Sequence, residues 1–182
     1  FEDTIDNNNI ILMLMNDETI GYIEKNKFEA RNRGSKLKNS KINQSGFDIN
    51  VKTIYDGKLK DECFFITSKG RIFKEVLWKF SKKFYNIRNY FNLMNDEDVI
   101  KIVTFEESDN KNLILISNLM VKNIKLSLFD NVTAKSGKYA ISLQDNDVLT
   151  NVLIHDPDAN EVLVVLSTEG KVLKFDKEQI KE

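Results

Sequence analysis

The chain has 182 residues, of which 41% are hydrophobic and 30% are charged, and its formal net charge is −1. These values are typical of one soluble globular domain, so we treat residues 1–182 as a single domain and exclude a disordered chain. The longest apolar run, Ile10 to Met15, is far shorter than the ~20 residues that cross a membrane, which excludes a transmembrane helix.

Charge is distributed unevenly along the chain. Residues 1–92 carry 17 Lys and Arg against 12 Asp and Glu, whereas residues 93–182 carry 10 against 16. The first half is therefore net +5 and the second half net −6, an asymmetry that weakly favours a polyanionic partner for the first half. The acidic start at Phe1, without Met or a signal pattern, predicts that the chain is a fragment of a longer protein.

One hairpin unit occurs four times, about fifty residues apart, over residues 10–25, 63–74, 113–122 and 162–174. Each copy has an apolar strand, a tight polar turn and a second strand that ends near a lysine. The turns contain Gly21, Gly70 and Gly170, which suits hairpin turns because they often need positive φ. Leu119 replaces glycine in the third copy, which predicts a different turn there.

A second element recurs between the hairpins. Residues 92–103 resemble residues 142–152, with Asp98 and Asp147 49 residues apart, and residues 46–51 form a fainter copy. A short strand, an acidic turn and a returning strand in each unit give about four strands per unit, which is typical of propeller blades. The sequence therefore predicts an all-β, propeller-like fold of about four blades. The alternative is a β-sandwich whose hairpins are similar by chance.

The residue types that most often carry chemistry form no active-site pattern. Cys63 lies in an apolar run and is expected to be a buried structural thiol. The single histidine, His155, lies in a turn sequence, so no zinc site is predicted. We assign no catalytic residue and no metal ligand, and we expect little helix apart from one terminal turn at residues 177–180.

Basic residues gather in two stretches about one repeat apart, which would lie on equivalent edges of adjacent blades. A curved basic track suits the phosphates of bent duplex DNA and binds them without reading sequence. For any single lysine, a solvated surface position is the plain alternative. The predicted DNA-binding residues are Lys25, Lys27, Arg31, Arg33, Lys36, Lys38 and Lys41 after the first hairpin, and Arg71, Lys74, Lys79, Lys82, Lys83 and Arg88 around the second.

The third and fourth units are more acidic, and we expect them to bind DNA weakly or not at all. Aromatic residues interleave with the second basic stretch, as they do in proteins that bind single strands. Their strand spacing favours packing instead, and we expect packing of Trp78 too. The aromatics in question are Phe80, Phe84, Tyr85, Tyr90 and Phe91, and the lysines of the third unit are Lys122, Lys125, Lys135 and Lys138.

Several linked motifs resemble the C-terminal DNA-binding domain of the A subunit of bacterial type IIA topoisomerases, namely DNA gyrase and topoisomerase IV. The family pattern runs roughly G-Y-I-K-R, then L-F-F-T-x-x-G-R-V-Y-x-L-K, then N-L-L ahead of D-E-x-I. The resemblance covers most of the chain and is strongest over residues 10–105. The matching residues are Ile20 to Lys25, Cys63 to Lys74, and Asn92 and Leu93 followed by Asp96 to Ile100.

This resemblance implies a β-pinwheel, a propeller variant whose blades exchange strands, which binds and bends duplex DNA around its rim. Members usually have five or six blades, so four repeats imply a shortened or open domain. The implied partners are double-stranded DNA, the remainder of the same polypeptide and the ATPase B subunit in a heterotetramer, within the cytoplasm at the nucleoid. The domain would be a non-catalytic part of an ATP-dependent isomerase and would hold no cofactor, because ATP, Mg²⁺ and the tyrosine that links to DNA serve elsewhere in the complex.

One departure from the family bears on which enzyme is meant. In gyrase, the first blade carries a Q-R-R-G-G-K-G box, and in the corresponding residues 31–37 only Arg33, Gly34 and Lys36 match. A degraded box favours topoisomerase IV. Gyrase remains an alternative, as does a propeller that acts as a protein-interaction scaffold. We expect charge reversal at Arg33 with Lys36, or at Arg71 with Lys74, to weaken DNA binding with little loss of folding.

Overall fold

Thirteen short strands make up nearly half of the part of the chain that the structure, a computed structural model, describes. The described residues are 4–27, 50–80, 85–104, 106, 110–159, 162–176 and 179. The helical elements whose bounds lie among the described residues are α1 (Ile87–Phe91) and short 3-10 turns at Lys25–Lys27, Leu77–Lys79 and Leu126–Phe129. The all-β prediction is confirmed. Most of the expected turn at residues 177–180 lies outside the described residues.

Four antiparallel hairpins occupy the four predicted places. In the first three, the first hairpin strand also pairs on its other side with a third strand that follows later in the chain. The hairpins are β1 (Asn9–Met15) with β2 (Thr19–Glu24), β4 (Glu62–Thr67) with β5 (Arg71–Val76), β8 (Asn112–Ser117) with β9 (Val121–Lys125), and β12 (Leu163–Leu166) with β13 (Val172–Phe175); the third strands are β3 (Val51–Lys58), β7 (Val99–Thr104) and β11 (Leu149–His155).

Neighbouring sheets exchange strands. The two-residue strand β6 (Tyr85–Asn86) follows the second hairpin but pairs with β2 of the first sheet, and β10 (Lys138–Tyr139) follows the third hairpin but pairs with β5 of the second sheet. The crossings are equivalent, because each exchanged strand is followed by a residue whose N–H donates to the turn carbonyl of the earlier hairpin: Ile87 to Glu18 at 2.8 Å, and Ala140 to Gly70 at 2.8 Å. Each unit is thereby tied to the one before it.

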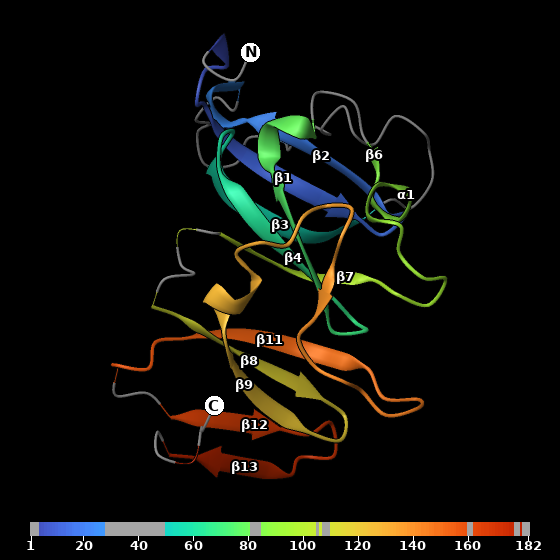
Figure 1. The fold of residues 1–182 in the computed structure, drawn as a ribbon, viewed down its shortest axis with the longest axis vertical. Coiled ribbons are helices and arrows are strands. Elements are labelled where there is room, and N and C mark those ends of the chain that lie inside the picture. The colour runs from blue at the N-terminus through green and yellow to red at the C-terminus, as the bar shows by residue number, and fades with distance from the viewer. Residues whose placement is uncertain are drawn as a thin grey trace, which may run out of the picture.

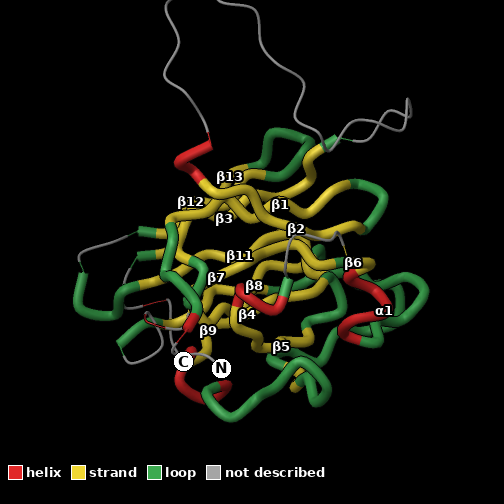
Figure 2. Tube along the Cα trace, turned by 90° about the horizontal axis from the view of Figure 1, so that it is seen from above, coloured by secondary structure: helices red, strands yellow, loops and turns green. Residues whose placement is uncertain are grey.

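The four sheets follow one another along the longest axis of the molecule, in chain order, with the first and fourth sheets at opposite ends (Figure 1). Figure 2, seen from above, shows α1 at the margin of the strands. The asparagine side chain of Asn86 caps α1 by accepting the N–H of Asn89 at 3.0 Å, and Asn92 ends it in the left-handed region at φ 51°. The described strands thus form an open row of sheets.

The second sheet is buried on both faces because alternate residues of a strand point to opposite sides. Cys63 and Phe65 of β4 belong to a core shared with the first sheet, whereas Phe64 and Ile66 belong to a core shared with the third. The segments that carry the exchanged strands fill both cores: Ile87, Phe91 and Leu93 enter the first, and Phe129, Ala140 and Ile141 enter the second.

Most of the aromatics around the second basic stretch pack, as predicted. Phe91 contacts the rings of Phe65 and Phe73 with centroids 5.0 Å apart, and Phe80 is fully buried. Trp78, Tyr85 and Tyr90 are partly buried against the same core, and Phe84 lies outside the described residues. Burial of several Phe side chains, each worth ~1.5–3 kcal/mol, makes this junction a main source of stability.

Cys63 is the buried, free thiol that the sequence predicts, and burial raises its pKa to about 12. It is therefore a protonated, unreactive side chain at neutral pH. His155 is not a turn residue: it ends strand β11, opposite Asn112, and is buried.

Two details of the predicted repeat register are wrong. Gly21 lies within β2 opposite Met13, and the residue with positive φ in the first turn is Glu18, at 67°, as Gly70 is at 77° in the second. The acidic counterpart of Asp147 is Glu97, fifty residues away, rather than Asp98. The prediction of a different third turn is confirmed, because four residues separate Ile116 from its partner Val121 where five separate Ile66 from Ile72.

Candidate nucleic-acid interface

The predicted DNA-binding residues divide into two sets. Within the described part of the chain, five of them have placed side chains: Lys25, Arg71, Lys74, Lys79 and Arg88. The placed set can be judged by what each ammonium or guanidinium contacts. The others lie outside the described residues, namely Arg31, Arg33, Lys36, Lys38, Lys41, Lys82, Lys83 and the side chain of Lys27.

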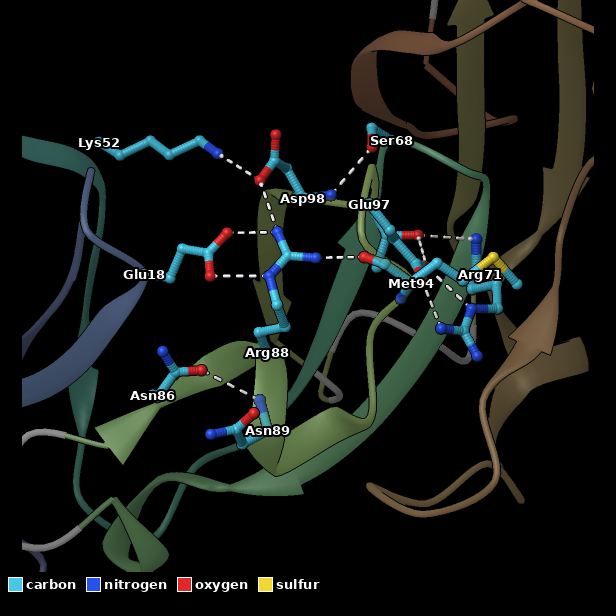
Figure 3. Close-up of polar contacts among 11 residues, drawn as sticks. Glu18, Lys52, Ser68, Arg71, Asn86, Arg88, Asn89, Met94, Glu97 and Asp98 are labelled. Carbon is cyan, nitrogen blue, oxygen red and sulfur yellow. Dashed lines mark hydrogen bonds and ion pairs between the residues drawn. The ribbon is translucent and has the colours of Figure 1, made fainter.

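Arg88 joins the first sheet to the second (Figure 3). It projects from α1, and its Nε donates to Glu18 Oε2 at 2.8 Å while its second terminal nitrogen contacts Glu18 Oε1 and lies 3.6 Å from Asp98. The guanidinium hydrogen bond lowers the pKa of Glu18, in spite of partial burial that acts to raise it. Because Glu18 occupies the left-handed position of the first turn, this pair fixes the turn against the exchanged segment.

Arg71 makes a second and more buried pair of the same kind, also drawn in Figure 3. Its Nε donates to Glu97 Oε1 at 2.8 Å, its Nη2 contacts Glu97 Oε2, and the same nitrogen donates to the carbonyl of Asn92 at 3.2 Å. Glu97 is fully buried and also accepts the Thr67 hydroxyl at 2.6 Å and the Met94 N–H at 2.9 Å. This carboxylate has all of its hydrogen-bonding capacity in use.

The protonation of Glu97 follows from these contacts. Burial raises the pKa of Glu97, but the hydrogen bonds from Arg71, Thr67 and Met94 outweigh burial and hold the pKa below its ordinary value. The pKa of Arg71 is raised by the same pair. Both groups are therefore charged over the whole neutral range, as a bidentate arginine–carboxylate pair requires.

The remaining three placed residues also have partners. Lys25 pairs with Asp56, and Lys79 donates to Glu75 at 2.7 Å and lies 5.8 Å from the Trp78 ring centre. Lys74 donates to the carbonyl of Asp130 and lies 3.9 Å from Glu62. Lys25 and Lys79 keep about two-fifths of their side chains exposed, at 38% and 42%. These two lysines can turn toward an anion at little cost, because exposed ion pairs contribute little.

Arg71 and Arg88 contribute to folding in this geometry, and their side chains are only 15% and 22% exposed. Charge reversal at Arg71 would place a negative group against the buried Glu97. This geometry argues against the expectation that Arg71 with Lys74 can be reversed with little loss of folding. Whether either arginine contacts DNA stays a prediction.

Two lysines of the third unit donate to carbonyls rather than to carboxylates, as Lys74 also does. Lys122 donates to the carbonyl of Ala140 at 2.8 Å and Lys138 to that of Leu128 at 3.2 Å, and Lys135 is exposed on the loop between them. A carbonyl carries no net charge, so it fixes an ammonium group without neutralising it. Sequence reasoning missed this distinction because it counted acidic residues along the chain rather than contacts in space.

The hydroxyl–carboxylate pairs were missed as well, although a signal for them exists. Thr67 with Glu97 and Ser117 with Asp147 are each separated by thirty residues, and the hydroxyl residues are fifty residues apart. Hydroxyl residues at that spacing are visible in the sequence once the register is known. The sequence alignment matched Asp147 with Asp98 instead of Glu97, and this one-residue error hid the equal spacing of the two pairs.

Nothing in the described ranges indicates a catalytic or metal centre. No group of three or more His, Cys, Asp or Glu side chains there is arranged to hold a metal ion. Among the same residues, none of the helices has the length and apolar character needed to span a bilayer.

No family model matches the chain. Curated A subunits of DNA gyrase are similar to it over nearly its whole length: 22% identical over 187 residues in Clostridium acetobutylicum, 27% over 170 in Leptospira biflexa and 25% over 188 in Escherichia coli. These alignments cover 99%, 90% and 99% of this chain. The chain spans about a fifth of the length of these relatives, 22%, 20% and 21%.

Solved structures with the same fold come from both enzymes of the resembled family. A DNA gyrase A C-terminal domain aligns at a TM-score of 0.66 and 20% identity, covering 92% of this chain and 54% of its own. A topoisomerase IV C-terminal domain aligns at 0.68 and 18%, covering 96% and 53%, and the E. coli ParC C-terminal domain at 0.67 and 18%, covering 94% and 66%. The chain therefore has the β-pinwheel fold of the C-terminal domains of DNA gyrase A and topoisomerase IV.

Proposed function

We propose that this chain is a DNA-binding domain from the A subunit of a type IIA topoisomerase, and that it binds and bends duplex DNA without sequence preference. The observation that carries the proposal is the combination of a strand-exchanged pinwheel with sequence similarity to the gyrase A protein along 99% of the chain. Neither feature alone would suffice, because one fold can host unrelated functions.

The charge distribution supports a polyanionic partner. The first 92 residues are net +5, and both predicted basic stretches lie within them. Each phosphate that a lysine or arginine neutralises releases counterions, which gives affinity that depends on salt and not on base sequence. Bending a 20–30 bp site costs of order 1–6 kcal/mol, so several such contacts must act together.

The placed side chains suggest a division of labour. Arg71 and Arg88 hold the junction between sheets, whereas Lys25 and Lys79 are exposed and directly precede the stretches that contain the other predicted residues. Lys122, Lys135 and Lys138 add charge that no carboxylate is recorded to neutralise in the described part of the chain. We propose that DNA is held by the exposed lysines while the arginines maintain the curvature of the row of sheets.

We further propose that the enzyme is of the topoisomerase IV type. The support is the degraded box at residues 31–37, which retains Arg33, Gly34 and Lys36 but lacks two of its glycines. The curated relatives bear the gyrase name, and the solved neighbours include both types. In this proposal the domain is non-catalytic and holds no cofactor. Strand passage, with ATP and Mg²⁺, takes place in the other domains of the polypeptide and in its B-subunit partner, in the cytoplasm.

A gel-shift titration of the chain with a mixed-sequence duplex tests the DNA proposal. Binding at 50 mM salt that weakens steeply by 200 mM, with the same affinity for unrelated sequences of equal length, is the expected result. Absence of duplex binding at low salt would overturn the proposal and favour a protein-interaction scaffold.

A topology assay separates the two enzymes. The full-length protein that contains this domain, assembled with its B-subunit partner and ATP, is expected to relax and decatenate DNA. Introduction of negative supercoils into relaxed plasmid would show that the enzyme is a gyrase and would overturn the topoisomerase IV proposal.

A further inference from the structure

A cavity of about 570 Å³ lies at the junction of the first and second sheets, and most of its wall is aromatic. All of these aromatic side chains are partly buried and pack against the first core, so each ring also has a part that is open to the cavity. The volume is within the range of small-ligand sites. The aromatic residues are Tyr22 of β2, Trp78 of the 3-10 turn after β5, Tyr85 of β6 and Tyr90 of α1.

The aromatic character is specific to this junction. The pairing register of the strands and the 3-10 turns after β5 and β9 identify the equivalent positions of the next junction. There the chain has Lys74 in place of Tyr22, Ser127 in place of Trp78 and Lys138 in place of Tyr85. Closing a junction therefore does not require aromatic side chains at these positions, and a ligand-binding role accounts for them at the first junction.

Two of the aromatic residues have polar edges that can contact a ligand. The hydroxyl of Tyr90 donates to Glu75 at 2.8 Å. For the hydroxyl of Tyr22 and the indole N–H of Trp78, no hydrogen-bond partner is recorded in the described ranges. Burial raises the pKa of Tyr22, so its hydroxyl keeps its proton at neutral pH. The cavity thus offers flat apolar faces with a few hydrogen-bond donors among them.

A second cavity, of about 610 Å³, adjoins the first, because Lys79 and Tyr90 line both. Its charged residues are Lys74, Lys79, Lys135, Glu62 and Glu75. Three lysines against two carboxylates leave one net positive charge, and the buried Glu75 already accepts Lys79 and Tyr90. The ammonium group of Lys79 lies 5.8 Å from the Trp78 ring centre, so positive charge stands at the border between the two cavities.

We propose that the two cavities together bind one nucleotide unit of single-stranded DNA. The base stacks on the aromatic wall of Tyr22, Trp78 and Tyr85, and the adjacent phosphate lies at the ammonium groups of Lys79 and Lys135. Stacking tolerates any base, because every base has a π-face. Paired bases are stacked inside a duplex and cannot enter unless they flip out, so the site distinguishes unpaired from paired DNA.

Charge favours a strand over a free nucleotide as the occupant. A phosphodiester carries one negative charge, which the single net positive charge of the second cavity balances. The phosphate of a free nucleotide carries nearly two at neutral pH. The choice of DNA as the polymer rests on the proposed function, whereas the stacking site itself goes beyond duplex binding and does not depend on it.

Trp78 is the only tryptophan of the chain, so its fluorescence reports directly on the first cavity. Titration of the 182-residue chain with oligothymidylate of about ten nucleotides, a length within the range of single-strand sites, should quench this emission saturably. An abasic strand of equal length keeps the phosphates but has no base, and it should quench little. A duplex of that length should also leave the emission nearly unchanged, and thymidine monophosphate should bind roughly ten-fold more weakly than the strand.

Substitutions separate stacking from charge. Tyr22→Leu removes one ring and should weaken oligothymidylate binding roughly ten-fold, whereas Tyr22→Phe keeps the ring and should lose about three-fold or less. Lys135→Gln, at an exposed position, should weaken binding several-fold and lower the slope of log K against log salt by about 0.7. Tyr139→Leu is the matched control, because Tyr139 is exposed on the exchanged strand β10 outside both cavities, and affinity should be unchanged. Thermal unfolding verifies that each variant is folded.

Several outcomes would overturn the proposal: no quenching, equal quenching by the abasic strand or the duplex, binding of thymidine monophosphate as tight as that of the strand, or tighter binding of oligouridylate. Unchanged affinity in both Tyr22→Leu and Lys135→Gln would do so as well. The readout is separate from the duplex gel shift. Quenching by oligothymidylate without any duplex binding would overturn the proposed duplex function and support this site.

Discussion

In the second and third sheets, the hydroxyl group at the equivalent turn position donates a hydrogen bond to an acidic side chain. The two acids are neutralised in different ways. In the second sheet Glu97 accepts Thr67 and a bidentate Arg71. In the third, Asp147 accepts Ser117 at 2.7 Å and the N–H groups of Asn118 and Val148 at 3.1 and 2.9 Å, with Met120 at the ladder position of Arg71. The repeat thus retains a hydrogen bond, and the buried ion pair is an addition to it.

Both acids are buried, Glu97 at 0% and Asp147 at 3% exposure, so burial alone does not decide how each is neutralised. The second sheet is covered on both faces, and its carboxylate is paired with a cation. In the third sheet the Ser117 hydroxyl and two N–H groups hold the acid, and no cation pairs with it among the described residues. The two junctions therefore differ in the partners of the acid and not in whether it is buried.

Removal of Arg71 gives the largest expected effect. Arg71→Met leaves Glu97 buried without its cation, and breaking such a pair from one side costs about 3–5 kcal/mol. For a chain of this size that corresponds to a fall in Tm of roughly 10 °C. Thermal unfolding followed by circular dichroism measures it. Met120→Leu, at the same ladder position of the third sheet, is the matched control and should change Tm by a degree or two; equal losses in both variants would contradict the comparison.

Neutralising the two acids compares the junctions directly. Glu97→Gln loses the charge partner of Arg71 and is expected to cost about 3 kcal/mol, whereas Asp147→Asn keeps an oxygen for the N–H donors and should cost about 1 kcal/mol. Urea unfolding of the two variants gives both free energies. A larger loss at Asp147 than at Glu97 would show that the N–H contacts, and not the arginine, provide the stronger closure.

The pH dependence of stability sharpens the same comparison. The folded-state pKa of Glu97 lies below its ordinary 4.5, so its contribution is fully present above about pH 4.5 and is lost as the pH falls through the folded-state pKa. Glu18 behaves in the same way. The native chain should therefore be equally stable, as far as these groups are concerned, at pH 7 and pH 5, and weaker at pH 3.

Arg71→Met should reverse the sign of the contribution that Glu97 makes to the pH dependence of stability. Without the guanidinium, burial is opposed only by the hydrogen bonds from Thr67 and Met94, so we expect the pKa of Glu97 to rise and the folded state to bind the proton more readily than the unfolded state. The variant is then expected to become more stable between pH 7 and pH 5, where the native chain does not. Urea midpoints at pH 7, 5 and 3 measure this, and a parallel pH response of the two proteins would refute the role of Arg71.

The sequence was sufficient for the hairpins because alternating apolar residues and turn residues recur at a fixed interval. It misplaced the first turn, since Gly21 offered the expected residue three positions from Glu18, which adopts the positive φ instead. It could not reveal the arginine pairs, because Arg71 and Arg88 lie 26 and 70 residues from their carboxylates. Arg71 meets Glu97 through the pairing of β5 and β7 with β4, and Arg88 meets Glu18 through the exchanged two-residue strand β6. Strand exchange itself was expected from the family resemblance and not from any local pattern.

The smallest expected effect concerns the lysines, and it extends the comparison to DNA. Lys79 of the second unit is opposed by Glu75, whereas Lys122 and Lys138 of the third donate to carbonyls and keep their full charge. If DNA binds along the lysines that have no carboxylate partner, the double variant Lys122→Gln with Lys138→Gln should bind duplex DNA several-fold more weakly. Each phosphate contact that is lost should also lower the slope of log K against log salt by about one.

Lys79→Gln is the matched variant, and it should have a smaller effect because Glu75 already neutralises that ammonium group in the free protein. Gel-shift titrations at 50, 100 and 200 mM salt give both the affinity and the slope. Glutamine can still donate to the carbonyls of Ala140 and Leu128, so thermal stability should stay within about 0.5 kcal/mol of the native chain. A larger loss for Lys79→Gln than for the double variant would place binding in the first two units, as the charge count along the sequence predicts.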